Sequence, residues 1–252
     1  MDYLDIHAHL NFPEYEADRA EVIKRLKENK VGVINVGTDA KTSAEVVKLA
    51  EENENMWATV AMHPHEVETP FDYDYFKALA QHPKVVAIGE CGLDYFKLED
   101  ETVKNKQQEL FKQHIKLAKE VGKPLMLHIR DSYDDVLAIL ESEQAGRAHA
   151  HFFAGSWAVA QKFLDRGDSL SFTGVITFTH DYDEVIRNIP LDKLMAETDA
   201  PYVAPVPYRG KRNEPLYVIE VYKRLAELKD LPLEEAREAI LVNAKRIFDL
   251  DA

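Results

Sequence analysis

Two histidines one residue apart stand near the start of the chain, in the stretch Asp5-Ile-His-Ala-His9. The stretch completes a short apolar run, and side chains two residues apart on a β-strand point to the same side. Two neutral imidazoles on one side of a strand end provide half of a site for a divalent metal ion. Two histidines in an ordinary loop would give the same pattern, so the interpretation depends on matching ligands at the ends of later strands.

Candidate partners follow later apolar runs, each at the point where a predicted strand ends. In chain order, the residues of this kind are His7, His9, His63, Glu90, His128, Arg130, His151 and Asp199. One such residue alone commonly forms a loop hydrogen bond or caps a helix. Buried carboxylates, however, are costly unless they are paired or metal-bound. The recurrence at six of the eight predicted strand ends therefore predicts a metal centre. We expect His65, His149 and His180 to be structural instead.

The elements that must position these residues are short apolar segments that alternate with longer amphipathic ones. We expect strands at residues 3–7, 31–36, 56–62, 85–89, 124–129, 147–153, 170–172 and 194–197. Helices are expected between them, the first at 14–29 and the longest at 101–121. Eight strand-helix units predict an α/β fold, a closed (β/α)8 barrel of TIM type, as a single domain over residues 1–252. The alternative is an open doubly wound sheet, but no Gly-x-Gly-x-x-Gly follows the first strand.

All strand C-termini lie on one face of such a barrel, so the candidate ligands are expected to meet there. They are His7, His9, Glu90, His128, His151 and Asp199. Six ligands exceed what one tetrahedral catalytic ion uses, so we expect two divalent metal ions, with magnesium, manganese or zinc all compatible.

The expected arrangement places one pair of histidines on each ion. His7 and His9 are expected to bind the first ion. His128 and His151, at the ends of the fifth and sixth strands, are expected to bind the second. Glu90 is predicted to bridge the ions, because the fourth strand lies between these pairs around the ring. Asp199 returns beside the first strand when the barrel closes. We expect it to serve the first ion and to accept a proton from the attacking water.

Composition limits the classes of function. The chain has 252 residues and a formal net charge of −14, which argues against binding nucleic acid along a broad basic surface. Local binding of an anion is still compatible, because divalent ions can dominate the charge of a site. Cys91 is the only cysteine, so no internal disulfide forms, which fits a reducing cytoplasm. We find no signal-peptide pattern and no apolar run of about 20 residues, so a cytoplasmic location without membrane contact is expected.

The whole pattern resembles the TatD-type metal-dependent deoxyribonucleases of the amidohydrolase superfamily. The matching stretches are Asp5-Ile-His-Ala-His9, Gly89-Glu-Cys-Gly-Leu-Asp-Tyr95, His128-Ile-Arg130, Glu197-Thr-Asp-Ala-Pro-Tyr202 and Arg209-Gly-Lys-Arg-Asn-Glu-Pro215. The resemblance implies a barrel fold, metal binding by the six candidate ligands, and in several members degradation of DNA from the 3′ end. One stretch departs from the family pattern. After the sixth strand the family usually has His-Cys-Phe-Ser/Thr-Gly, and this chain has His151-Phe-Phe-Ala-Gly155, which changes the pocket wall rather than a ligand.

These observations predict a hydrolase that cleaves phosphodiester bonds of DNA with a metal-activated water. His63 and Arg130 are expected to bind phosphate oxygens. Arg209 and Asn213 lie on the proline-rich loop 201–213 and are expected to contact a neighbouring phosphate or sugar. Glu197 faces the same way as Asp199 and is expected to orient a ligand or Arg130. The acidic balance predicts single-stranded or frayed 3′ ends as substrate. No obligate protein partner is evident.

Two other functions fit parts of the pattern. The first is an amidohydrolase that acts on a small cyclic amide or lactone. Many such enzymes bridge their metals with a modified lysine at the end of the fourth strand, where this chain has Glu90. The second is a metal-stabilised binding module. Structural metal sites are usually closed by cysteine and histidine, whereas this set is rich in carboxylate.

Overall fold

Eight parallel strands form one sheet in sequence order, from β1 to β8. The computed structural model describes residues 1–250. The strands are β1 (Tyr3–Ala8), β2 (Val31–Val36), β3 (Met56–Val60), β4 (Val85–Asp94), β5 (Leu125–Arg130), β6 (Ala148–Ala150), β7 (Ser169–Phe172) and β8 (Leu194–Ala196). The sheet closes because the backbone N–H of Asp199 donates to the carbonyl of His7 and that of His9 to the carbonyl of Ala200, at 3.0 and 2.8 Å. The predicted (β/α)8 barrel is confirmed.

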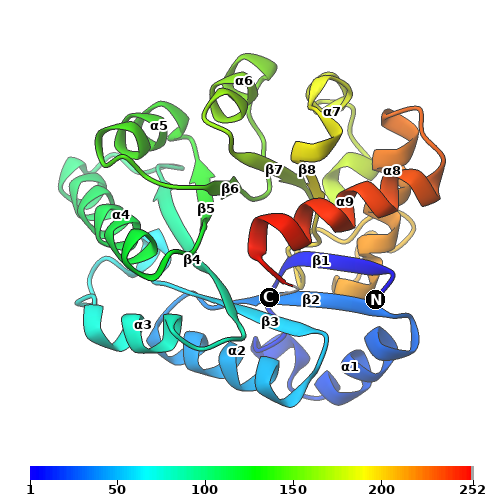
Figure 1. Ribbon diagram of the computed structural model, residues 1–252, viewed down its shortest axis with the longest axis horizontal. Coiled ribbons are helices and arrows are strands. Elements are labelled where there is room, and N and C mark those ends of the chain that lie inside the picture. Colours follow the sequence, from blue (N-terminus) through cyan, green and yellow to red (C-terminus); the bar gives the residue numbers. More distant parts are fainter. Residues whose placement is uncertain (251–252) are drawn as a thin grey trace.

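Helices surround the barrel (Figure 1). They are α1 (Arg19–Glu28), α2 (Ala40–Glu52), α3 (Tyr73–Ala80), α4 (Glu101–Val121), α5 (Tyr133–Ser142), α6 (Trp157–Asp165), α7 (Asp183–Asn188), α8 (Val218–Leu228) and α9 (Leu233–Phe248). The helix expected at 14–29 begins only at Arg19. Residues Pro13–Tyr15 form a separate 3₁₀ turn, and the buried Tyr15 anchors it by donating from its hydroxyl to the carbonyl of Asn213 at 2.6 Å.

The last helix closes one end of the barrel. Figure 1 shows α9 lying across the strands in front of β1. Its buried side chains Ala244, Ile247 and Phe248 pack in one cluster with barrel residues, among them Leu4 and Ile6. This apolar plug fills the end of the barrel that holds the strand N-termini. The polar residues are thereby left to the opposite end.

Two strands are irregular close to the predicted ligands. The pairing register of β1 shifts between Asp5 and Ala8, and that of β4 shifts between Ile88 and Cys91. Such irregularities re-aim side chains and are frequent beside active sites. The fourth strand also continues to Asp94, beyond its predicted end at 89. Gly92 allows this, since its φ is 138° and a Cβ there would lie 2.2 Å from the carbonyl oxygen of His128.

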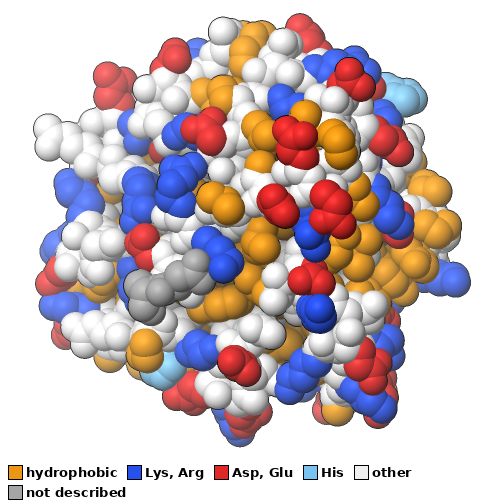
Figure 2. Space-filling view, turned by 45° about the vertical axis from the view of Figure 1, so that its right-hand side comes forward, with side chains coloured by type: hydrophobic (Ala, Val, Ile, Leu, Met, Phe, Trp, Pro, Cys, Tyr) orange, Lys and Arg blue, Asp and Glu red, His pale blue; other side chains and the backbone are white. Residues whose placement is uncertain are grey.

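The surface carries both signs of charge. Acidic and basic side chains are interspersed over the face that Figure 2 shows, with apolar side chains between them. Among residues 1–250, no helix is both long and apolar enough to cross a lipid bilayer.

Candidate active site

The ends of the strands surround a cavity of about 740 Å³. Its lining includes most of the predicted ligands together with residues of the loops after the strands. These are His9, His63, Glu90, His128, Arg130, His151 and Asp199, joined by Phe12, Thr38, His65, Asp94, Phe152 and Tyr202 among others. Residues far apart in the sequence thus meet at one face, as the barrel prediction required.

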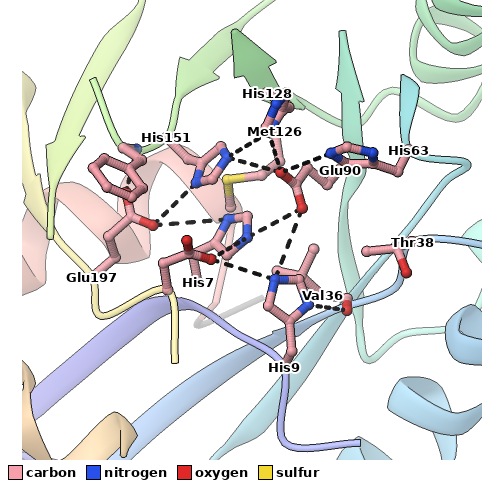
Figure 3. Close-up of polar contacts among 12 residues, drawn as sticks. His7, His9, Val36, Thr38, His63, Glu90, Met126, His128, His151 and Glu197 are labelled. Carbon is pink, nitrogen blue, oxygen red and sulfur yellow. Dashed lines mark hydrogen bonds and ion pairs between the residues drawn. The ribbon is translucent and has the colours of Figure 1, made fainter. Parts of the chain in front are cut away.

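Glu90 lies at the centre of this arrangement (Figure 3). Its Oε1 atom lies 2.6 Å from Nδ1 of His128 and 2.9 Å from Nε2 of His151. Its Oε2 atom lies 3.5 Å from Nε2 of His7 and 3.9 Å from Nε2 of His9. The two carboxylate oxygens therefore face two different pairs of imidazoles, which is the arrangement expected of a bridging ligand.

Asp199 completes the group on the β1 side. Its Oδ1 atom lies 3.5 Å from Nε2 of His9 and 3.7 Å from Nε2 of His7. His7 is fully buried, and neither of its ring nitrogens has a hydrogen-bond partner. A buried polar atom without a partner is costly, and a divalent cation held by His7 and the two carboxylates would satisfy Nε2. The donor set of imidazoles and carboxylates therefore fits a divalent metal.

Three of the candidate histidine ligands are oriented by a hydrogen bond to the ring nitrogen that faces away from Glu90. His9 donates from Nδ1 to the carbonyl of Val36 at 3.1 Å. His151 donates from Nδ1 to Oε2 of Glu197 at 3.2 Å. Such partners fix the tautomer and leave the other nitrogen free for a metal. The expectation that Glu197 orients a ligand is consistent with this contact.

The partner of the third ligand is Asp94, which the sequence did not single out. His128 donates from Nε2 to Oδ2 of Asp94 at 3.0 Å. The same oxygen lies 3.2 Å from Nε2 of His65, a residue expected to be structural, whose side chain is largely exposed at the rim of the cavity. One signal for Asp94 was present, because it stands four residues after Glu90, and residues at even spacing on a strand share a side.

Burial and charge set the protonation of this cluster. Burial alone raises the pKa of Glu90, but the neighbouring imidazoles of His151 and His7 outweigh it and hold the pKa well below its usual range. Burial also lowers the pKa of His7 and lowers that of His63 to about 3. Glu90 is thus ionised, and His7 and His63 are neutral at physiological pH. Burial also lowers the pKa of His9, His128 and His151, but the carboxylates beside them outweigh burial and raise it, so these imidazoles release a proton when a metal binds.

The predicted substrate-binding residues fall into two groups. His63 and Arg130 line the cavity, and the Arg130 guanidinium stacks 3.6 Å from the ring centre of Phe96. Arg209 and Asn213 are not among the described lining residues. Arg209 stacks on the ring of Phe178.

Asn213 lies near the end of the loop after β8 and is fully buried. Its side-chain amide donates to the carbonyls of Thr198 and Tyr202 at 3.0 and 2.6 Å. It holds the loop in place rather than facing the cavity.

The remaining histidines lie away from Glu90. His149 is buried between the hydroxyls of Ser169 and Ser171, at 2.9 and 2.7 Å. His180 lies on the surface beside Asp183. Both positions agree with the expectation of structural roles.

The model of the family described as TatD related DNase matches residues 4–249. The chain belongs to this family. A Bacillus subtilis relative named as the uncharacterized metal-dependent hydrolase YabD is 42% identical over 98% of this chain and 99% of its own length. The Escherichia coli metal-dependent hydrolase YcfH, also uncharacterized, is 35% identical over 100% of this chain and 97% of its own.

Solved structures agree with this membership of the TatD family. The crystal structure of the TatD homologue YjjV from Escherichia coli has a TM-score of 0.90 at 30% identity, over 98% of each chain. A structure from the engineering of organophosphate hydrolysis activity from a weak promiscuous lactonase template has a TM-score of 0.67 at 14% identity, which shows a shared fold alone. The protein is thus a metal-dependent hydrolase of the TatD family with a (β/α)8 barrel.

Proposed function

We propose that this protein hydrolyses phosphodiester bonds of DNA and removes nucleotides from single-stranded or frayed 3′ ends. The observation that carries the proposal is the position of Glu90, whose two oxygens face separate imidazole groups. This arrangement suits two cations, with His7, His9 and Asp199 around the first. The second would lie among His128, His151 and Glu90. Divalent cations there supply Lewis-acid chemistry that polarises a phosphodiester and makes water nucleophilic near neutral pH.

His63 has a defined tautomer that suits a phosphate contact. The backbone N–H of His65 donates to Nδ1 of His63 at 3.2 Å, so Nε2 of the neutral ring carries the proton. Nε2 lies 3.7 Å from Oε1 of Glu90, on the cavity side. The ligand atoms of His63, Glu90 and His128 lie close enough together for the three residues to share a cation. A protonated Nε2 cannot bind a metal, however, and it donates to a nonbridging phosphate oxygen instead.

Two further residues act on the phosphodiester in this proposal. Arg130 supplies a permanent positive charge at the cavity and contacts a phosphate oxygen in the planar, two-point geometry of guanidinium. Asp199, whose side chain is 15% exposed, accepts the proton of the attacking water. The arginine thereby offsets the charge of the phosphate and the aspartate activates the nucleophile. Arg209 and Asn213 stabilise the loop after β8, to which they belong, in this scheme.

The preference for unpaired ends rests on charge. Affinity along a duplex depends on neutralising many phosphates. The chain has a net charge of −14, and its acidic and basic groups are interspersed over the visible face (Figure 2). A strand end that enters the cavity needs only local contacts with the metal centre and Arg130.

The test is a substrate panel with protein stripped by chelator and reloaded with magnesium, manganese or zinc. Each form is incubated with labelled single-stranded DNA, blunt duplex DNA, RNA, a phosphomonoester and a lactone. We expect single-stranded DNA to shorten from the 3′ end, and Glu90→Gln to abolish this while circular dichroism shows a native fold. Turnover of the lactone alone, or full activity of Glu90→Gln, would contradict the proposal.

A further inference from the structure

The cavity has two chemically different halves. The loop after β3 contributes His63, and the last residues of β4 and β5 contribute Asp94 and Arg130. The loops after β6 and β8 contribute Phe152 and Tyr202. Among the described lining residues, Arg130 is the one with a permanent positive charge, so an anionic chain is drawn to its half. The other half offers aromatic rings beside the metal centre.

Phe152 is held in this wall by a strained backbone. Its φ is 43°, in the left-handed region that a bulky residue rarely adopts. Its backbone N–H donates to Oε1 of Glu197 at 2.5 Å, and the other oxygen of that carboxylate holds His151. The backbone of Phe152 is therefore fixed relative to a candidate metal ligand through a single buried carboxylate. Asp199 and Val203, which also line the cavity, have φ values of 54° and 50°.

Tyr202 adds an exposed ring on a fixed loop. Half of its surface is accessible to solvent. Its backbone N–H donates to the carbonyl of Asp199 at 2.9 Å, and its carbonyl accepts from Asn213. A large apolar ring that stays exposed on a rigid backbone is a preformed contact surface.

We infer that Phe152 and Tyr202 form a stacking wall for the unpaired terminal base of the DNA strand; this inference rests on the proposed function. The scissile phosphodiester lies at Glu90 and the rest of the DNA strand extends towards Arg130. The terminal base therefore lies on the side of the cavity that Phe152 and Tyr202 line. Stacking on aromatic rings tolerates every base, since each has a π-face. The wall therefore makes the enzyme depend on the presence of a base rather than on its identity. A paired base cannot stack there, which adds a second reason for a preference for frayed ends.

The first experiment compares two oligonucleotides with the same final phosphodiester, one ending in a nucleotide and one in an abasic tetrahydrofuran residue. We expect the wild type to favour the nucleotide in kcat/KM by roughly 5- to 150-fold, the range for one stacked base. In the double variant Phe152→Leu/Tyr202→Leu, which keeps apolar bulk without π-faces, the ratio falls towards one. Tyr202→Phe is the matched control and keeps the ratio. A wild-type ratio of one, or an unchanged ratio in the double variant, overturns the inference.

A second measurement separates this inference from the proposed function. With chelator present, an oligonucleotide that ends in 2-aminopurine is titrated with protein, and fluorescence quenching reports stacking without cleavage. Quenching by wild type and Tyr202→Phe, together with its loss in the double variant, supports the wall. If no DNA is cleaved with any metal, the proposed function fails, and this titration still decides the inference. Absence of quenching in the wild type refutes it.

Discussion

Replacing Asp94 with asparagine is expected to weaken metal binding without unfolding the barrel. In the wild type, Oδ2 of Asp94 accepts the Nε2 proton of His128 at 3.0 Å, and Nδ1, which lies 2.6 Å from Oε1 of Glu90, is the nitrogen that would give up its proton to bind a metal. Oδ1 accepts the backbone N–H of Phe96 at 3.0 Å. An asparagine that keeps the Phe96 contact through its oxygen points its amide N–H groups at His128. Two donors then face each other, and His128 adopts the other tautomer, with the proton on Nδ1.

The magnitude follows from the role of this proton. A ligand nitrogen must be unprotonated to bind a metal, and losing the partner behind a ligand typically costs 10- to 100-fold in metal affinity. This corresponds to about 1.4–2.7 kcal/mol. Isothermal titration of chelator-treated Asp94→Asn with zinc or manganese measures the affinity, and elemental analysis measures the number of ions retained after dialysis.

His65→Gln is the matched control for Asp94→Asn. It removes the second imidazole near the same oxygen, at 3.2 Å, and leaves the contact with His128 in place. We expect it to change metal affinity much less. If Asp94→Asn binds metal as tightly and in the same stoichiometry as the wild type, then Asp94 does not set the tautomer of His128, and the reasoning is refuted.

Three other perturbations follow from the packing and burial. Phe248→Ala empties the apolar plug of the barrel and should lower the free energy of unfolding by about 3–5 kcal/mol in urea denaturation; a loss below about 1 kcal/mol would show that α9 does not seal the core. Burial lowers the pKa of His114 to about 4 from 6.5, so between these values the unfolded chain binds a proton that the folded chain does not. Stability should fall as the pH drops from 6.5 to 4, by up to about 3 kcal/mol from this group, and less steeply in His114→Gln when the two pH series are compared. Saturating metal should raise the free energy of unfolding by about 2.7 kcal/mol at 100 times the dissociation constant, and a melting temperature that does not respond to metal would contradict binding to the folded state.

The sequence was sufficient to predict the barrel and to predict that the candidate metal ligands lie together. Strand ends could be located from alternating apolar and amphipathic segments, and a parallel barrel brings all strand C-termini to one face. For His7, His9 and Asp199 nothing more was needed, because the first and last strands are neighbours once the ring closes.

The roles of some residues depend on backbone irregularity or on contacts between distant parts of the chain, and these roles could not be predicted from the sequence. Asp94 lies beyond the strand predicted at residues 85–89, whereas in the structure Gly92 lets this strand continue past the bulge to Asp94. Asn213 stands on a basic loop and was expected to contact substrate. Its amide instead donates to two backbone carbonyls of the same connection between β8 and the following helix, 11 and 15 residues earlier, a contact that no local pattern encodes.

Glu197 connects the metal centre to the aromatic wall, and its replacement tests both at once. Its carboxylate accepts the Nδ1 proton of His151 on one oxygen and the backbone N–H of Phe152 on the other. In Glu197→Gln, either orientation of the amide turns an N–H group towards one of these donors. We therefore expect weaker metal binding together with a reduced preference for a terminal base.

Ser171→Ala is the control for Glu197→Gln, since it removes a contact of 2.5 Å to the same carboxylate and leaves both N–H donors in place. Isothermal titration with metal and the nucleotide-to-abasic ratio are measured on both variants. Wild-type values for Glu197→Gln in both assays would show that the metal ligand and the wall are positioned independently. The single amide oxygen of the Glu197→Gln side chain can accept from His151 or from Phe152 but not from both. A change in only one of the two assays would therefore identify which N–H group still donates to that oxygen.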